Sequence, residues 1–319
     1  MKKVWVVSFS GVTKEELARL PVGQVCCQLA ELAALVRMDG TLQISAGQQY
    51  ALNVVTENAT VARRVYRLAK ELLRCRVDIV VRRKLRLRKN NSYVVKIYPR
   101  GVADLQRLGL LDEKMHILPG VAKELVKHRC DQKAYLRGAF LAGGSINNPE
   151  GTYHLEIITN DAHHAAALCR LLNGFGLGAK VSGRKSWQVV YLKESEHIVG
   201  FLALIGAHHA LLEFENVRVV KDMRNQVNRL VNCETANLNK TVDAAVRQAE
   251  NIRLVQETVG LEELPQALRE IAVLRLQYPD SSLKELGQML TPPVGKSGVN
   301  HRMRKIDEWA ERIRRSRQP

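Results

Sequence analysis

The sequence predicts an α+β protein in which a duplicated domain is followed by an all-α domain of short helices. Three observations support this fold class. A pattern recurs along the chain at an offset of about 104 residues, each copy contains strands of alternating apolar and polar residues, and helical periodicity dominates beyond residue 213. At roughly 150 residues per domain, the 319 residues are long enough for two domains.

The internal repeat defines the first domain. Residues 32–41 (LAALVRMDGT) align with residues 136–145 (LRGAFLAGGS), and each segment reads as a helix that ends in glycine. Residues 50–56 (YALNVVT) then align with residues 153–159 (YHLEIIT), and both alternate as half-buried strands do. Each half therefore reads α-β-β-α-β-β-α, with mixed or antiparallel sheets. We place the domain at 1–212, with halves at about 24–120 and 130–212.

A basic hairpin is expected in the first half. Arg76 to Arg88 and Ser92 to Tyr98 read as two strands joined by a turn at Asn90-Asn91, and residues 60–100 hold 14 Lys and Arg against 2 acidic residues. Alternation places the cations on one face of the sheet, where they are candidates for contact with DNA phosphates; a solvated edge strand protected by charge is the alternative. The candidate contacts are Arg82, Arg83, Lys84, Arg86 and Arg88.

Residues 213–260 form a helical linker in this interpretation. No proline interrupts residues 217–259, and apolar residues such as Val242, Val246 and Ala249 recur at helical spacing. One long helix, or two, is expected to join the domains.

Residues 261–319 predict a helix-turn-helix domain. One helix ends before Pro279, a capping box at Ser282 opens a second, and Ser297 caps a third, amphipathic helix. Two short helices followed by a basic one match the helix-turn-helix plan, in which the last helix enters the major groove of DNA. The alternative is an ordinary three-helix bundle with a charged surface, because the turn at residues 291–295 is longer than usual.

The third helix carries the main candidates for DNA recognition. We expect Asn300, His301 and Arg302 to lie nearest the bases, and Arg304 and Lys305 nearer the phosphates. Together with the capping residue, the candidate DNA-binding residues of this helix are Ser297, Asn300, His301, Arg302, Arg304 and Lys305.

Charge and composition narrow the function classes further. The net charge of +17 favours a polyanionic partner, here double-stranded DNA, and the absence of a long apolar run or signal peptide predicts a cytoplasmic, nucleoid-associated protein without a membrane partner. The six cysteines contain no CxxC pair, so we expect no metal and no cofactor. The His163-His164 and His208-His209 pairs read as surface or interface residues, since neighbours on a helix point about 100° apart.

The repeated helices resemble the LAGLIDADG motif of homing endonucleases, here in a chain with two copies. The resemblance implies that the two motif helices pack together at a pseudo-two-fold axis and that the acidic residue before the final glycine of each copy holds divalent metal. That residue is Asp39 in the first copy, but Gly143 stands in the second. Two carboxylates are needed for two-metal cleavage, so we expect a degenerate motif with no catalytic residues and no enzyme activity. An active endonuclease built on Asp39 alone is the less favoured alternative.

Over nearly its full length the chain resembles the WhiA family of bacterial regulators. The stretch at residues 232–241 (NCETANLNKT) and the carboxy-terminal helices carry this resemblance together with the motif helices. It implies a transcription regulator involved in cell division, chromosome segregation and, in spore-formers, sporulation, with a sigma factor or another regulator protein as a further partner. Under a third interpretation, the repeat domain binds protein and the helix-turn-helix alone binds DNA.

Overall fold

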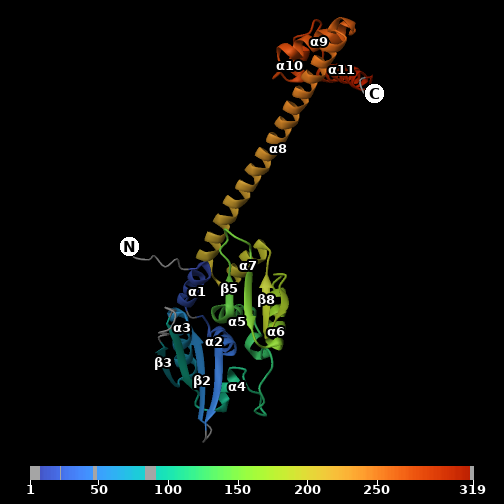
Figure 1. Ribbon diagram of the computed structural model, residues 1–319. Coiled ribbons are helices and arrows are strands. Elements are labelled where there is room, and N and C mark those ends of the chain that lie inside the picture. The colour runs from blue at the N-terminus through green and yellow to red at the C-terminus, as the bar shows by residue number, and fades with distance from the viewer. Residues whose placement is uncertain (1–7, 22, 46–48, 83–90, 317–319) are drawn as a thin grey trace. The chain divides into compact units, whose positions relative to one another are not determined.

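The structure is a computed structural model that describes residues 8–21, 23–45, 49–82 and 91–316 (Figure 1). The chain separates into two compact units, residues 1–221 and 222–319. Each unit is described by itself below.

The first half of the amino-terminal unit follows a short leading helix, α1 (Phe9–Arg19). Its four strands form an antiparallel sheet in the order β1-β2-β4-β3. The elements are α2 (Val25–Asp39), β1 (Gly40–Ser45), β2 (Gln49–Thr56), α3 (Ala59–Leu73), β3 (Arg76–Arg82), β4 (Ser92–Tyr98) and α4 (Val102–Arg107).

The second half repeats this order. After the 3₁₀ turn η1 (Lys123–Val126), its strands form an antiparallel sheet in the order β5-β6-β8-β7. The elements are α5 (Arg129–Gly143), β5 (Gly144–Ile146), β6 (Leu155–Thr159), α6 (Ala162–Asn173), β7 (Lys180–Arg184), β8 (Trp187–Leu192) and α7 (Ser195–Ile205). The expected α-β-β-α-β-β-α duplication is confirmed, and both sheets are antiparallel throughout.

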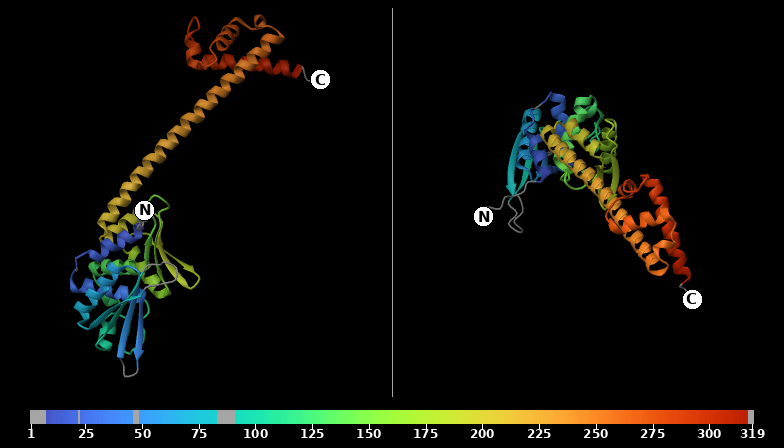
Figure 2. Two further views of the ribbon diagram at one scale, coloured as in Figure 1. Left: turned by 60° about the vertical axis from the view of Figure 1, so that its left-hand side comes forward. Right: turned by 90° about the horizontal axis from the view of Figure 1, so that it is seen from above.

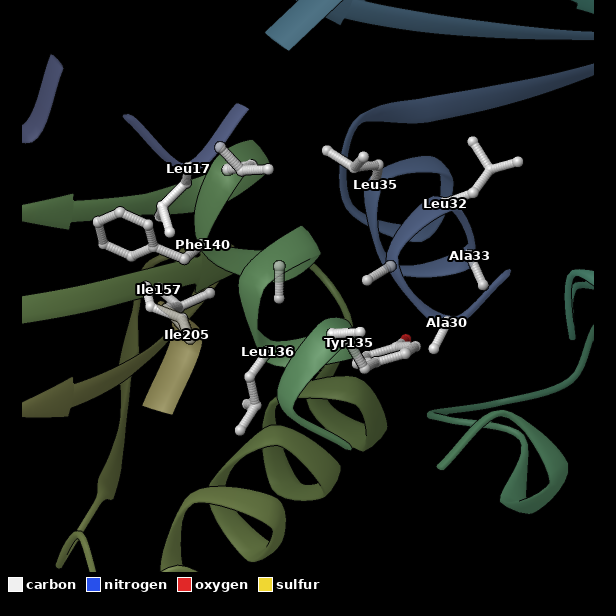
Figure 3. Packing of buried hydrophobic residues seen from close by; sticks show 14 of the residues in the cluster. Leu17, Ala30, Leu32, Ala33, Leu35, Tyr135, Leu136, Phe140, Ile157 and Ile205 are labelled. Carbon is white, nitrogen blue, oxygen red and sulfur yellow. The ribbon is translucent and has the colours of Figure 1, made fainter. Parts of the chain in front are cut away.

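The two motif helices, α2 and α5, pack against each other at the centre of this unit. Figure 3 shows buried side chains that they contribute. Small residues allow the close approach: Ala30, Ala34 and Ala139 are fully buried, and a Cβ atom added at Gly138 would lie 2.5 Å from the carbonyl oxygen of Glu31. Glycine at residue 138 therefore sets the spacing of the helices.

A buried ion-pair network ties α2 to both α3 and α5. The carboxylate of Glu31, 1% exposed, accepts hydrogen bonds from Arg64 Nε (2.8 Å) and Nη2 (3.0 Å). Arg137 donates to the same carboxylate from Nε (3.0 Å) and Nη2 (2.9 Å). Buried charges persist only when paired in this way, so the network fixes how the two halves meet.

Helix α8 (His208–Thr258) continues without a break across the boundary between the units (Figures 1 and 2). Its beginning belongs to the first core, where the Phe214 ring lies 6.3 Å from that of Phe9. The expected boundary at residues 212 and 213 thus falls inside a single long helix.

The carboxy-terminal unit surrounds the end of α8 with short helices. Its core is made of apolar residues from α8, α9 and α11, with Leu286 from α10 and with Leu264 and Leu290 from the connecting segments. The elements are η2 (Leu261–Glu263), α9 (Gln266–Gln277), α10 (Leu283–Gln288) and α11 (Lys296–Ser316).

Of the two helix starts predicted from the sequence for α10 and α11, the structure confirms the first. The capping box of Ser282 and Glu285 opens α10 as expected. The expected cap at Ser297 is wrong, because α11 already begins at Lys296 and Ser297 lies within its first turn. Gly287 allows the loop before α11 to pack on α10: its carbonyl accepts a hydrogen bond from Val294 N (2.9 Å), and a Cβ there would collide with the Val294 carbonyl.

Candidate nucleic-acid interface

The exposed face of α11 is the strongest candidate surface in the carboxy-terminal unit. Val299, Met303 and Ile306 occupy one side of the helix and are buried in the core. Ser297, Asn300, His301 and Arg304 are exposed, and their spacing of three or four residues places them along the other side. This side combines hydrogen-bonding groups with a cation, as a DNA-reading helix requires.

Two of the expected residues are engaged within the protein. Arg302 is half-buried, and its Nη1 donates a hydrogen bond to the carbonyl oxygen of Ala267 in α9 (3.3 Å). The ammonium of Lys305 lies 3.0 Å from the carboxylate of Glu308 one turn later. In this conformation the guanidinium of Arg302 is directed towards α9, away from the side on which His301 and Arg304 lie.

Polar contacts hold α11 and the loop before α10 in place. Asn251 of α8 donates to the Asp307 carboxylate (2.7 Å) and accepts from Arg314 (2.5 Å), so the carboxy-terminal half of α11 is tied to α8. The buried Arg275 donates to the carbonyl oxygens of Pro279 (3.2 Å) and Ser281 (2.7 Å). The candidate face is thereby carried on a rigid scaffold.

The basic hairpin is described only in part. Arg82 is exposed at the end of β3, opposite Ser92 of β4, whereas Arg83, Lys84, Arg86 and Arg88 lie outside the described residues. Arg76 begins the strand, pairs with Asp78 (2.9 Å) and stacks over the Tyr98 ring at 5.3 Å. The described part of β3 therefore presents both cationic and acidic groups.

The carboxyl ends of the motif helices open on a pocket of about 930 Å³. Asp39 lines it from α2 and Ala142 from α5, and Lys14 enters from α1, with Nζ donating to the Ala142 carbonyl (3.2 Å). Further polar residues from α1, β2, α3, β4 and the adjoining turns also line it: Ser8, Ser10, Glu15, Thr56, Glu57, Asn58, Thr60, Asn91 and Tyr93.

Burial perturbs both titratable groups at this end of the pocket. It raises the pKa of Asp39 to about 6 and lowers the pKa of Lys14 to about 8, and in each case the attraction of the opposite charge opposes the shift. At neutral pH both groups are therefore mostly charged. The ammonium of Lys14 supplies positive charge beside Asp39, where a motif of two carboxylates would attract a divalent cation.

The second motif copy offers no acidic side chain at the equivalent place. Gly143 ends α5, and a Cβ atom there would lie 2.6 Å from the carbonyl oxygen of Ile158. Where the two motif helices end, the pocket thus has a single carboxylate, that of Asp39, with Lys14 beside it. Its other two lining carboxylates, Glu15 and Glu57, come from outside the motif helices. The sequence reasoning missed Lys14 because α1 lies outside the repeat and nothing in its spacing links it to the motif.

In the His163-His164 pair, one residue does not lie where the sequence predicts. His164 is fully buried, where its Nε2 lies 3.0 Å from the Tyr135 hydroxyl and its Nδ1 lies 3.4 Å from the hydroxyl of Thr159. The expectation of a surface or interface position is therefore wrong for His164. His163, directly before it, is exposed.

No helix among the described residues has the length and apolar character needed to cross a membrane.

Three family models match successive parts of the chain. The WhiA N-terminal LAGLIDADG-like domain matches residues 25–111, the WhiA LAGLIDADG-like domain matches residues 132–224, and the WhiA C-terminal HTH domain matches residues 227–310.

Similar proteins cover nearly the whole chain. A "probable cell division protein WhiA" from Desulfitobacterium hafniense (strain Y51) is 76% identical over 96% of each chain, and one from Heliobacterium modesticaldum (strain ATCC 51547 / Ice1) is 62% identical over 97% of this chain and 98% of its own. The crystal structure of full-length WhiA from Thermatoga maritima superposes with a TM-score of 0.58 at 27% identity, covering 96% of this chain and 98% of its own.

Proposed function

The chain belongs to the WhiA family, and from this premise we propose that it is a sequence-specific, non-enzymatic DNA-binding transcription regulator that acts at the nucleoid in the cytoplasm. Its proposed roles are in cell division, the word that the names of its relatives carry, in chromosome segregation and, in spore-formers, in sporulation. The observation that carries the proposal is the exposed face of α11, with Asn300, His301 and Arg304, in a matched helix-turn-helix domain.

The chemistry of these side chains suits contact with DNA in the major groove. Asn300 offers an amide that fits the edge of adenine, His301 a donor and an acceptor, and Arg304 a guanidinium for a phosphate or a guanine. Rigid support by Asn251 and Gly287 favours specific recognition, because little ordering of the protein is then needed on binding.

Footprinting of the full chain on genomic DNA fragments tests the proposal. We expect protected sites that share a sequence. Asn300→Ala should reduce the preference for those sites over random DNA, since each good base contact contributes about 1–3 kcal/mol of discrimination. Lys284→Ala, which removes an exposed positive charge from α10, should leave the preference for those sites unchanged. Equal affinity of the unmodified chain for all fragments would contradict the proposal.

The proposal excludes nuclease activity. It is supported by Gly143 at a position where the resemblance requires a carboxylate, and by the Lys14 ammonium beside Asp39. The motif positions supply one carboxylate with a cation beside it, so the paired carboxylates that would hold two divalent ions for activation of water and stabilisation of the leaving oxygen are missing there.

A second candidate role for the repeat domain is contact with a protein such as a sigma factor or another regulator. The observation that favours it is the exposed apolar run Ile79, Val80 and Val81 on the edge strand β3. Substitution of the candidate phosphate-contacting residues in the hairpin distinguishes DNA binding from protein binding. If Lys84, Arg86 and Arg88 contact phosphates, replacing all three with Gln lowers the salt-dependence slope of DNA binding by about 2.7. If the hairpin binds protein, the slope stays unchanged.

A further inference from the structure

Three cysteines and an aspartate meet where the two motif helices begin. Cys26 and Cys27 lie in the first turn of α2, and Cys130 and Asp131 lie in the first turn of α5. One sulfur from each cysteine and one carboxylate oxygen all lie within 4.8 Å of one another. The offset that relates the motif helices also relates these residues, since Cys27 and Asp131 are 104 positions apart.

We propose that this cluster, Cys26, Cys27, Cys130 and Asp131, binds a Zn²⁺ ion. Cysteine thiolates and a carboxylate are ordinary zinc ligands, and structural zinc sites in proteins hold four of them in a tetrahedron. The site is separate from the pocket at the carboxyl ends of the same helices.

The separations between donor atoms fit such a tetrahedron. With Zn–S of about 2.3 Å and Zn–O of about 2.0 Å, tetrahedral angles place two sulfurs about 3.8 Å apart and a sulfur and an oxygen about 3.5 Å apart. Here Cys26 Sγ and Cys27 Sγ are 4.0 Å apart, and Asp131 Oδ1 lies 3.5 Å from Cys27 Sγ and 3.6 Å from Cys130 Sγ. The remaining separations are at most 4.8 Å, so shifts of about 1 Å or less complete the site.

The carboxylate of Asp131 is already oriented. Its Oδ2 accepts a hydrogen bond from the backbone N–H of His128 (3.3 Å) and lies 3.0 Å from the ring Nδ1 of that residue, which leaves Oδ1 to face the thiols. Outer contacts of this kind position the ligands of metal sites.

The charge of the filled site suits its location. Three thiolates, one carboxylate and Zn²⁺ carry a net charge of −2, and the amino termini of both α2 and α5, where the partial charge of each helix is positive, stabilise an anion. The three thiols must lose their protons to bind the ion. Binding should therefore release protons and weaken at acidic pH.

The spacing favours a single ion over an iron–sulfur cluster. Each protein ligand of a cubane cluster binds a different iron, so its ligands are spread wider than four donors that share one metal. A single ion at this position joins the starts of α2 and α5 and thereby the two halves of the repeat.

Cobalt substitution tests the proposal on the full-length chain. The protein is purified with a phosphine reductant, stripped with a chelator and titrated with Co²⁺. We expect one ion per chain, with the intense visible absorption of tetrahedral cobalt and a thiolate-to-cobalt band in the near ultraviolet. Added Zn²⁺ should abolish both, because it binds such sites more tightly than Co²⁺.

Matched cysteine variants locate the ion. Cys26→Ser and Cys130→Ser change exposed residues, so we expect an intact fold by circular dichroism. Each removes one of three thiolates, so the thiolate band should weaken, whereas Cys233→Ser, which changes an exposed cysteine of α8, should keep the band at full intensity. His128→Ala should weaken Co²⁺ binding by about 10- to 100-fold through the freed Asp131 carboxylate. No thiolate band in the unmodified chain, or a band of full intensity in Cys130→Ser, overturns the proposal.

Discussion

At the scale of single residues, the pocket at the carboxyl ends of α2 and α5 differs from a two-metal cleavage site in two ways. One motif carboxylate is replaced, and a cation is added. Asp39 keeps the acidic position of the first copy, Gly143 removes that of the second, and Lys14 brings in a cation from outside the repeat. The sequence alone reveals the first two features, because the motif aligns with itself. The third depends on how α1 packs, which no local pattern encodes.

Restoring the missing carboxylate should not restore cleavage. In Gly143→Asp, the new Cβ would approach the Ile158 carbonyl at 2.6 Å, so the carboxylate is displaced, and Lys14 still competes for the space. We expect no nicking of plasmid DNA by the unmodified chain or by this variant with Mg²⁺ or Mn²⁺, and about 1–3 kcal/mol lower stability of the variant. Nicking that disappears with Asp39→Asn would contradict both the expectation and the proposed loss of nuclease activity.

The buried His164 should make the protein sensitive to acid. Burial lowers the pKa of its imidazole from 6.5 to about 4. Because the folded-state pKa lies below the unfolded one, the neutral ring contributes stability that is complete above pH 6.5 and is lost as the pH falls towards 4. Between pH 8 and pH 5 this contribution should fall by about 2 kcal/mol.

Urea unfolding at both pH values measures this effect. The loss of stability on going from pH 8 to pH 5 should be about 2 kcal/mol smaller in His164→Gln than in the unmodified chain. The neighbouring exposed residue provides the control, His163→Gln, which should behave as the unmodified chain does. An equal loss in all three proteins would show that His164 does not titrate in this range.

At the scale of elements, the close contact of α2 and α5 depends on the absence of a side chain at residue 138. Alanine is intrinsically better than glycine in a helix by about 1 kcal/mol, but here its Cβ would lie 2.5 Å from the Glu31 carbonyl and 2.9 Å from the Ala34 Cβ. Backbone atoms on the facing helix cannot move aside as a flexible side chain does. The steric clash therefore outweighs the gain in helix propensity, and alanine at residue 138 should destabilise the protein.

Gly138→Ala should lower the free energy of unfolding by about 1–3 kcal/mol in urea. Gly183→Ala is the control, because the nearest atoms to its added Cβ belong to the Gln188 side chain at 3.8 Å. Unchanged or increased stability of Gly138→Ala would mean that the helices separate at little cost.

The element scale also shows what the sequence could predict. Periodicity and the repeat identified both sheets and the helices of the carboxy-terminal unit, since those signals are local. The expected start of α11 lies two residues too late, because Ser297 is a good capping residue in isolation. The contact of Arg302 with Ala267 was out of reach, because it depends on the packing of α9 against α11.

At the scale of the whole molecule, the proposed metal ligands form no local pattern such as CxxC. Cys26 and Cys130 are distant in sequence and meet only through the pseudo-symmetric packing of α2 and α5. The offset of the repeat contains that information, but only once the two helices are known to lie side by side.

The residues that the structure describes form two hydrophobic cores with no residue in common. One core fills the repeat domain and includes Phe214. The other lies in the carboxy-terminal unit, and Ile252 is its first residue along the chain. Separate cores unfold as separate cooperative units, so calorimetry of the full chain should show two transitions. Substitutions within one core should then move one transition and leave the other in place.

Two variants make this expectation specific. Glu31→Gln leaves Arg64 buried without its anionic partner and should cost the first unit about 3–5 kcal/mol. Leu286→Ala, at a fully buried position, should cost the second unit about 2–5 kcal/mol, which at about 4–8 °C per kcal/mol for a unit of this size lowers its transition by about 10 °C or more. Because α8 runs through both units as one helix, a single transition shared by both cores is the contrary result. If both variants shift one common transition, the helix couples the cores, and the repeat domain and the helix-turn-helix domain fold as one body.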